Sequence, residues 1–300
     1  MTALVELGAD GWLKPGRYQW LRALVFMIAL AVLCVLTFNV AADTTLRFAA
    51  FLAGQPFTTR AAAPTGARLA AVLVGSLAML GAYALMVRWG ERRAAHEIDP
   101  RHALRELSIG VAIGGAIMAV ILAIMWSAGW VVLAAAPITG VAEAMKQTVQ
   151  SAVIEEVLMR IVIFRMLWRA FGVWPALIAT ALLFGGLHLA NPGASPFGAL
   201  CLIAGEGIGA GLYLLTGRLW MSIGMHAGWN FTLGWLFGST VSGLDAFVTG
   251  PLRMYPAQGV ATLLSGGGFG PEASVAALAV SLAGSAVCLT LAWRKGRFGT

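Results

Sequence analysis

The sequence predicts an all-α fold: a polytopic bundle of about eight membrane-spanning helices that forms one integral membrane domain over residues 1–300. Hydrophobic residues make up 59% of the 300 positions and charged residues only 11%, whereas soluble domains carry about 25% charged residues. The mean hydropathy is +0.83. Apolar stretches of about 20 residues, long enough to cross a bilayer as a helix, recur along the chain.

These stretches fall into three parts: N-terminal helices within 18–136, a motif-bearing core at 141–237, and a C-terminal loop and helix at 239–293. The fourth stretch is the least uniform, because Glu143 and Lys146 give its first turns a polar face that suits an interface or a water-filled entrance. The eight predicted helices are residues 20–40, 68–87, 107–128, 141–164, 173–190, 197–215, 220–237 and 273–293.

The first three predicted helices are plain apolar spans. The first, 20–40, follows Lys14 and Arg17 and ends in Val-Ala-Ala, so a cleaved signal peptide is the alternative interpretation. We favour a retained helix, because the apolar run is long and acidic residues precede it. The second and third, 68–87 and 107–128, enclose an arginine-rich connection.

The last five predicted helices hold the polar residues of the core. The fourth, fifth and seventh, 141–164, 173–190 and 220–237, each carry one polar cluster. The sixth, 197–215, has glycines at four-residue spacing, which allow close helix packing. The eighth, 273–293, follows a loop with the sequence Gly-Gly-Gly-Phe-Gly-Pro-Glu, which suits either tight turns on a re-entrant path or a plain flexible loop.

Lysine and arginine gather before the first predicted helix, in the second, fourth and sixth connections, and after the last helix. Because cytoplasmic connections carry an excess of these residues, both termini are predicted to be cytoplasmic, in the plasma (inner) membrane if the source is bacterial. This pattern accounts for the net charge of +7 and excludes nucleic acid as a partner. Cys34, Cys201 and Cys288 stand far apart in apolar runs and predict neither disulfides nor a metal motif.

Three polar clusters lie inside segments that otherwise favour the bilayer. They are Glu155-Glu156 with Arg160, Phe184 with His188, and His226 with Asn230. A charged side chain at the bilayer centre costs roughly 2.5 to 3.5 kcal/mol on insertion scales, so such residues are typical of functional sites.

The helical spacing of the first cluster separates its two acids. Glu156 and Arg160 are four residues apart and share a helix face, which predicts an ion pair. Glu155 is rotated by about 100° from Glu156 and is left as the candidate general base. A further acid, Glu206, belongs to no cluster, and either lines the cavity or is bonded locally.

The histidines complete a set for hydrolysis. His188 stands one turn after Phe184, so ring and imidazole share a face. His226 and Asn230 are also one turn apart and could donate two hydrogen bonds to one developing oxyanion. The sequence has no His-Glu-x-x-His zinc motif, no Gly-x-Ser-x-Gly elbow and no phosphate-binding loop.

In these motifs the sequence resembles the CPBP family (CAAX protease and bacteriocin-processing, or Abi) of intramembrane proteases. The family pattern is Glu-Glu-x-x-x-Arg, Phe-x-x-x-His and His-x-x-x-Asn/Asp, which the three clusters match in order. The glycine-rich loop before the last helix also resembles a stretch of bacterial members. The resemblance implies an eight-helix bundle in which Glu155 and His188 activate a water for attack on a peptide carbonyl.

By the same resemblance, His226 and Asn230 would hold the oxyanion, while Glu156 and Arg160 would support or orient them. The implied partners are the lipid bilayer and a membrane-anchored protein or peptide, with or without a lipid modification. No cofactor is expected. The alternative is a zinc-dependent form of the same protease, with Glu155, His188 and His226 as ligands.

A second hypothesis is a non-enzymatic transporter or binding scaffold whose buried carboxylates bind protons or cations. The absence of an evident inverted repeat and the concentration of the polar clusters in one half of the chain disfavour it. The residues alone therefore favour hydrolysis without determining the substrate.

Overall fold

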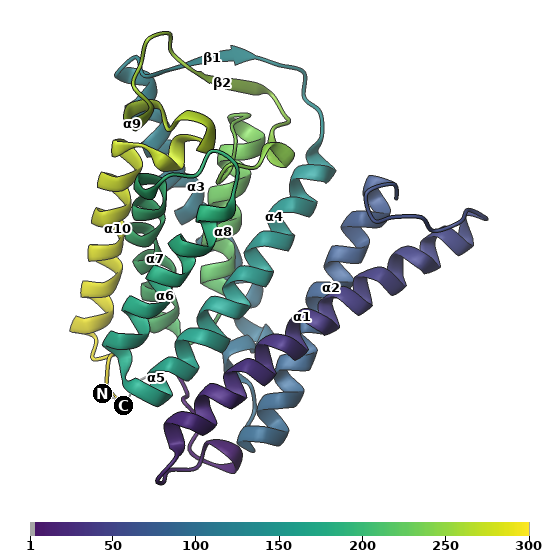
Figure 1. Cartoon of the computed structure of the whole chain (residues 1–300), viewed down its shortest axis with the longest axis vertical. Helices are drawn as coiled ribbons and strands as arrows, with labels where there is room; N and C mark the ends of the chain where they lie inside the picture. Colours follow the sequence, from purple (N-terminus) through teal and green to yellow (C-terminus); the bar gives the residue numbers. More distant parts are fainter. Residues whose placement is uncertain (1–3, 300) are drawn as a thin grey trace.

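The computed structural model describes residues 4–299 as a helical bundle, in which each of the eight predicted stretches overlaps a helix (Figure 1). Within these residues, six helices are long and apolar enough to cross a membrane, as expected for an integral multi-pass protein. The helices are α1 (Gln19–Leu52), α2 (Thr65–Met86), α3 (Ala103–Ser127), α4 (Val141–Glu156), α5 (Arg165–Phe171), α6 (Val173–Leu187), α7 (Pro196–Thr216), α8 (Trp220–Phe231), α9 (Thr262–Ser265) and α10 (Val275–Arg294).

Helix α1 is much longer than predicted. It has 34 residues, about 51 Å, and continues past the predicted end at residue 40 because its charges find partners. Asp43 accepts a hydrogen bond from Arg60 at 2.7 Å, and the Arg47 guanidinium lies over the ring of Phe57. With α2 it forms an oblique pair that leaves the bundle at the upper right of Figure 1.

A short antiparallel sheet joins the N-terminal part to the C-terminal loop. Strand β1 (Val131–Ala135) pairs with β2 (Leu252–Pro256), with Val131 opposite Pro256. The prediction of helices alone over 18–136, and of a loop without a strand before the last helix, was wrong at both places. These strands lie at the end of the bundle opposite the two chain ends (Figure 1).

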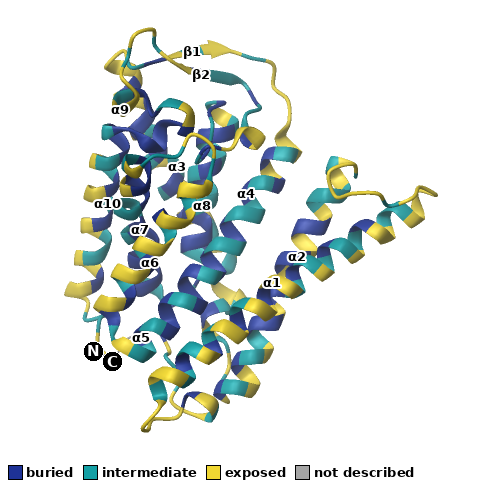
Figure 2. Ribbon diagram, viewed as in Figure 1, coloured by how far each residue is buried: buried dark blue, intermediate teal, exposed yellow. Residues whose placement is uncertain are grey.

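The bundle is most tightly packed around α7 and α8. Helix α7 is the most buried of the six candidate spans, while apolar side chains on the outer faces of α6 and α10 are exposed, as in Figure 2. Helix α8 lies directly against α3, because Gly110 and Gly114 let the backbones touch: an added Cβ at either position would overlap the carbonyl of Met221 or Met225. These two glycines are four residues apart, a spacing that allows such close packing of helices.

Helix α4 continues into α5 without a break through a π-helical segment, Val157–Phe164, and a second π-helical segment, Thr232–Leu236, extends α8. Such wider turns occur frequently at functional sites. Gly172, at φ +94, then turns the chain sharply from α5 into α6.

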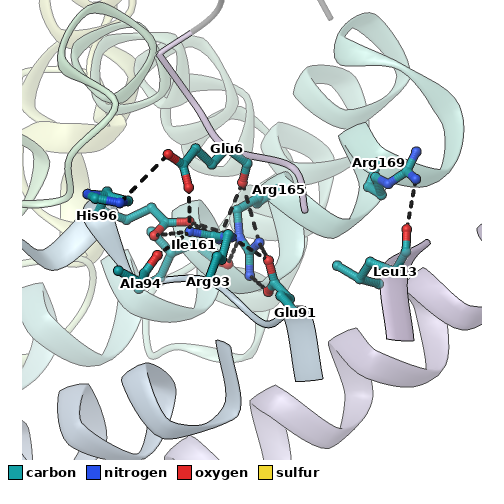
Figure 3. Close-up of polar contacts among 10 residues, drawn as sticks. Glu6, Leu13, Glu91, Arg93, Ala94, His96, Ile161, Arg165 and Arg169 are labelled. Atoms are coloured by element: carbon teal, nitrogen blue, oxygen red, sulfur yellow. Dashed lines mark hydrogen bonds and ion pairs between the residues drawn. The ribbon is translucent and has the colours of Figure 1, made fainter. Parts of the chain in front are cut away.

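A buried ionic cluster, drawn in Figure 3, holds the end of the bundle at which Figure 1 marks both chain ends. The guanidinium of Arg165, which is fully buried, donates to both oxygens of Glu91 at 2.7 and 2.6 Å. Arg93 bonds to Glu91, Glu97 and the N-terminal Glu6. The cluster therefore ties α5 to the connection between α2 and α3 and to the N-terminal segment.

Candidate active site

A single cavity of about 400 Å³ lies between α4 and its π-helical extension, α6, α7, α8 and the loop that follows α8. Its walls are largely apolar, so polar groups inside it are few and their positions matter. Every candidate side chain from the sequence analysis lines this cavity. They are Glu155, Glu156, Arg160, Phe184, His188, Glu206, His226 and Asn230.

The two neighbouring acids have different surroundings, because they project from different sides of α4. Glu156 is 2% exposed and accepts hydrogen bonds from Arg160 Nε at 2.7 Å and from His226. The Glu155 side chain remains 33% exposed, and its Oε2 lies 3.8 Å from His226 Nε2. The acid left unexplained by the sequence is therefore also the one free to bind a water.

His226 connects both carboxylates. Its Nδ1 lies 3.1 Å from Glu156 Oε1 and its Nε2 lies 3.8 Å from Glu155 Oε2. A carboxylate accepts hydrogen bonds, so Nδ1 carries a proton in this arrangement. The other ring nitrogen is thereby directed toward Glu155 and the cavity.

His188 ends α6 and faces the same space. Its Nδ1 lies 2.8 Å from the Phe184 carbonyl oxygen, which only accepts, so Nδ1 is the donor and Nε2 of the neutral ring is an acceptor. The Phe184 ring lies 4.6 Å from the His188 ring and 6.5 Å from the His226 ring, centroid to centroid. Phe184 thus packs against both imidazoles and fixes their separation.

Asn230 lies one turn after His226 on α8. Its Nδ2 donates to Ser151 Oγ at 3.0 Å, which orients the carboxamide and leaves its second N–H available. Ser151 is one turn before Glu155 on α4. Ser151 was not predicted as a site residue, because an isolated serine in a helix carries no signal of its own.

Arg160 and Glu206 explain each other. Arg160 donates to Glu156, as its spacing predicted, and also to both oxygens of Glu206, through Nη1 and through Nη2 at 2.9 Å. Gly209 lies three residues after Glu206 on α7 and makes room for the guanidinium of Arg160, which an added Cβ would overlap. The sequence left open whether Glu206 lines the cavity or is bonded locally. In the structure it does both, because it lines the cavity and is bonded to Arg160.

A third buried acid was not foreseen as part of the site. Glu272, in the glycine-rich loop, lines the cavity and accepts hydrogen bonds from Trp229 Nε1 at 2.7 Å and from the backbone N–H and hydroxyl of Ser242. The loop at residues 239–272, between α8 and α10, therefore folds over the cavity, and we call this segment the roof. The sequence did offer one signal for Glu272, which is an acid directly before the predicted membrane helix 273–293.

The zinc alternative requires Glu155, His188 and His226 to converge on one point. Among residues 4–299, no three His, Cys, Asp or Glu side chains are arranged to hold a metal ion. Both Nδ1 atoms are already bonded, and a zinc ion would need the three remaining donor atoms at about 2.0 to 2.2 Å. These side chains as placed do not form such a ligand set.

Comparison with known proteins shows a similarity in the part of the chain that carries the polar clusters. Residues 126–232 match the family model described as type II CAAX prenyl endopeptidase, Rce1-like. The motif-bearing core is thus similar to the CPBP family. The match covers about a third of the chain and includes all three polar clusters. No curated protein and no solved structure gives a significant match.

The CPBP match also separates two parts of the site. Glu155, His188, His226 and Asn230 all fall within the matched residues, whereas the roof loop with Glu272 follows them. The roof is thus contributed by a part of this chain outside the matched CPBP segment. Its contacts with α8 nevertheless make it part of the same cavity.

Proposed function

We propose that this protein is an intramembrane endopeptidase of the glutamic type, which hydrolyses a peptide bond of a membrane-anchored protein or peptide. The observation that carries the proposal is the shared cavity: one partly exposed carboxylate, two imidazoles and a carboxamide, from three separate helices, line the same apolar space. The match to a family model of CAAX prenyl endopeptidases supports the reaction class.

In the proposed mechanism, a water molecule bound between Glu155 and Nε2 of His188 is the nucleophile. Its oxygen attacks the carbonyl carbon of the scissile peptide, and Glu155 takes the proton that is lost. As the tetrahedral intermediate collapses, the carbon–nitrogen bond breaks and the proton passes from Glu155 to the leaving amine. The products are a new carboxylate and a free amine.

The oxyanion of the intermediate would be stabilised by N–H donors from α8. Asn230 offers its second N–H. His226 donates through Nε2 only when the ring carries both protons, and the carboxylates of Glu155 and Glu156 lie on either side of it. Removing one donor of this kind typically lowers kcat by about 100-fold to 1,000-fold.

The buried groups beyond the reacting atoms hold this arrangement. Glu156 bonds simultaneously to Arg160 and His226, so it fixes the imidazole and carries a charge that Arg160 compensates. We assign the supporting role to Glu156, Arg160 and Phe184, and no metal ion enters any step.

The substrate is expected to reach the cavity from the bilayer or its surface, since the apolar walls suit an extended or unwound membrane segment. Lipidation of the substrate is not required by the mechanism. With the lysines and arginines of the connections on the cytoplasmic side, both termini would face the cytoplasm.

The proposal is tested by comparing the C-termini of membrane proteins, by mass spectrometry, in cells that carry the wild-type protein or its Glu155→Gln variant. Glu143→Gln, on the same helix but outside the cavity, is the control. New C-termini in the wild type and the control that are missing in Glu155→Gln would support the proposal and identify the substrate. Identical termini in all three strains would reject it.

A further inference from the structure

We infer that Glu272 is a positioning residue of this active site: its buried carboxylate fastens the roof loop to α8 and thereby fixes His188 relative to His226 and Asn230. The inference rests on the proposed function. It assigns a role to an acid that neither touches the reacting groups nor lies within the matched family segment.

The carboxylate of Glu272 is buried and held only by donors. Trp229 Nε1 donates at 2.7 Å, Ser242 Oγ at 2.9 Å, and the backbone N–H of Ser242 donates to the same oxygen as the hydroxyl. No ion pair involves Glu272 within residues 4–299, so these neutral donors are what compensate its burial. A carboxylate is required here, because both of its oxygens face donors.

On one side, Glu272 fixes the helix that carries the oxyanion donors. Trp229 lies three residues after His226 and directly before Asn230. Its indole is packed among the apolar side chains beneath the sheet, and the bond to Glu272 anchors its polar edge. Because a helix turns as a rigid unit, anchoring Trp229 fixes the direction in which its neighbours project into the cavity.

On the other side, Glu272 reaches the segment that carries His188. Its partner Ser242 accepts, through its carbonyl oxygen, a hydrogen bond from Asn191 Nδ2 at 2.8 Å, and Asn191 is three residues after His188. The next residue of the roof, Gly243, packs against the Pro192 carbonyl, with no room there for a side chain. Glu272 thus links α8, through Trp229, to the segment after His188, through Ser242 and Asn191.

The backbone of Ser242 shows that this arrangement is imposed on the roof. Its φ is +47, a left-handed conformation that is uncommon for residues other than glycine. Such a conformation persists where surrounding contacts hold it, and here those contacts are the two hydrogen bonds to Glu272 and the one from Asn191. Without the carboxylate, Ser242 loses two of these three hydrogen bonds, and its backbone can return to a more common conformation.

The test uses the full-length protein in nanodiscs and the variant Glu272→Gln, which keeps the size but places an amide N–H₂ against a donor. Asp245→Asn is the matched control, since Asp245 is an exposed acid of the same loop and an asparagine still accepts the Thr240 hydroxyl hydrogen bond. Two measurements are made: cleavage kinetics on a peptide substrate, and hydrogen–deuterium exchange of residues 240–245.

We expect Glu272→Gln to lower kcat by about 10-fold to 100-fold with KM changed by less than about twofold, since misplacement of about 1 Å is enough for such a loss. Backbone exchange at 240–245 should be about 10-fold faster, with the control unchanged in both measurements. A purely structural role would lower the melting temperature and the active fraction, while leaving kcat per folded molecule intact.

Unchanged kcat in Glu272→Gln, or an equal loss in Asp245→Asn, would overturn the inference, as would exchange at 240–245 that does not change. Failure of the proposed function is recognised separately: the wild type would then cleave no peptide, or Glu155→Gln would cleave as fast as the wild type. The exchange measurement does not depend on activity and still decides whether Glu272 holds the roof.

Discussion

Arg160 and Glu206 are 46 residues apart in the sequence and form a buried ion pair at the wall of the cavity. Arg160 uses its remaining N–H groups on Glu156, so one cation serves two buried acids. Glu206 contacts Arg160, Arg160 contacts Glu156, and Glu156 contacts His226. A change at Glu206 is therefore expected to shift His226 through these contacts. The first prediction concerns this pair.

Glu206→Gln should lower the free energy of unfolding by about 1 to 3 kcal/mol, because it removes a hydrogen-bonded charge from a buried cation that keeps its other partner. The control is Asp43→Asn, which breaks the exposed pair with Arg60 and should cost less than about 1 kcal/mol. Unfolding in mixed detergent micelles measures both. Equal effects in the two variants would contradict the assigned burial.

Gly209→Ala tests the same contact from the other side. An added Cβ overlaps the Arg160 guanidinium, so we expect a loss of about 1 to 3 kcal/mol in stability and reduced cleavage. Gly186→Ala is the matched helical control, because nothing lies within 4 Å of its added Cβ, and it should be neutral or stabilising by up to about 1 kcal/mol. Thermal unfolding and peptide cleavage are the measurements; a neutral Gly209→Ala would show that Arg160 is free to move.

Glu91→Gln should destabilise the opposite end of the bundle. It removes the charge that faces the fully buried Arg165 and replaces one of the two oxygens that accept from its guanidinium with an N–H₂ group, and breaking a buried ion pair costs about 3 to 5 kcal/mol. The neighbouring Glu6 is about half exposed, so Glu6→Gln should cost less than about 1 kcal/mol. Denaturant titration of the purified protein compares the two; a mild effect of Glu91→Gln would mean that water enters the cluster.

Removal of metal ions should leave cleavage unchanged. Glu155, His188 and His226 do not form a zinc ligand set as placed, and the proposed mechanism uses a carboxylate as the base. The measurement is the cleavage rate before and after 1,10-phenanthroline, with and without added zinc. Loss of activity that zinc restores would replace the glutamic mechanism with the metal-dependent one.

Much of the fold was predictable because apolar length is a local property. All eight predicted ranges overlap helices, and the i, i+4 spacing of Glu156 and Arg160 predicted their pair. The end of α1 was predicted wrongly, because Asp43 is tolerated in the helix only through Arg60, which lies in the following loop. The strands β1 and β2 were missed because each is short and its partner is distant in the sequence.

The composition of the site was predicted from spacing, but its full extent was not. The Phe184 ring contacts the imidazoles of both His188 and His226, and this meeting of α6 with α8 follows from helix packing and not from spacing within either helix. Glu272 entered the cavity through the fold of a glycine-rich loop, which the sequence left open between two paths. Contacts that depend on loop conformation have no periodic signal from which to predict them.

The central claim is that Glu155 activates a water molecule for peptide hydrolysis. The most direct test is cleavage of a membrane-anchored peptide by the purified protein in H₂¹⁸O, with mass spectrometry of the fragments. We expect one ¹⁸O atom in the new C-terminal carboxylate, and a rate at least about 1,000-fold lower for folded Glu155→Gln. Cleavage by Glu155→Gln at the wild-type rate would contradict it.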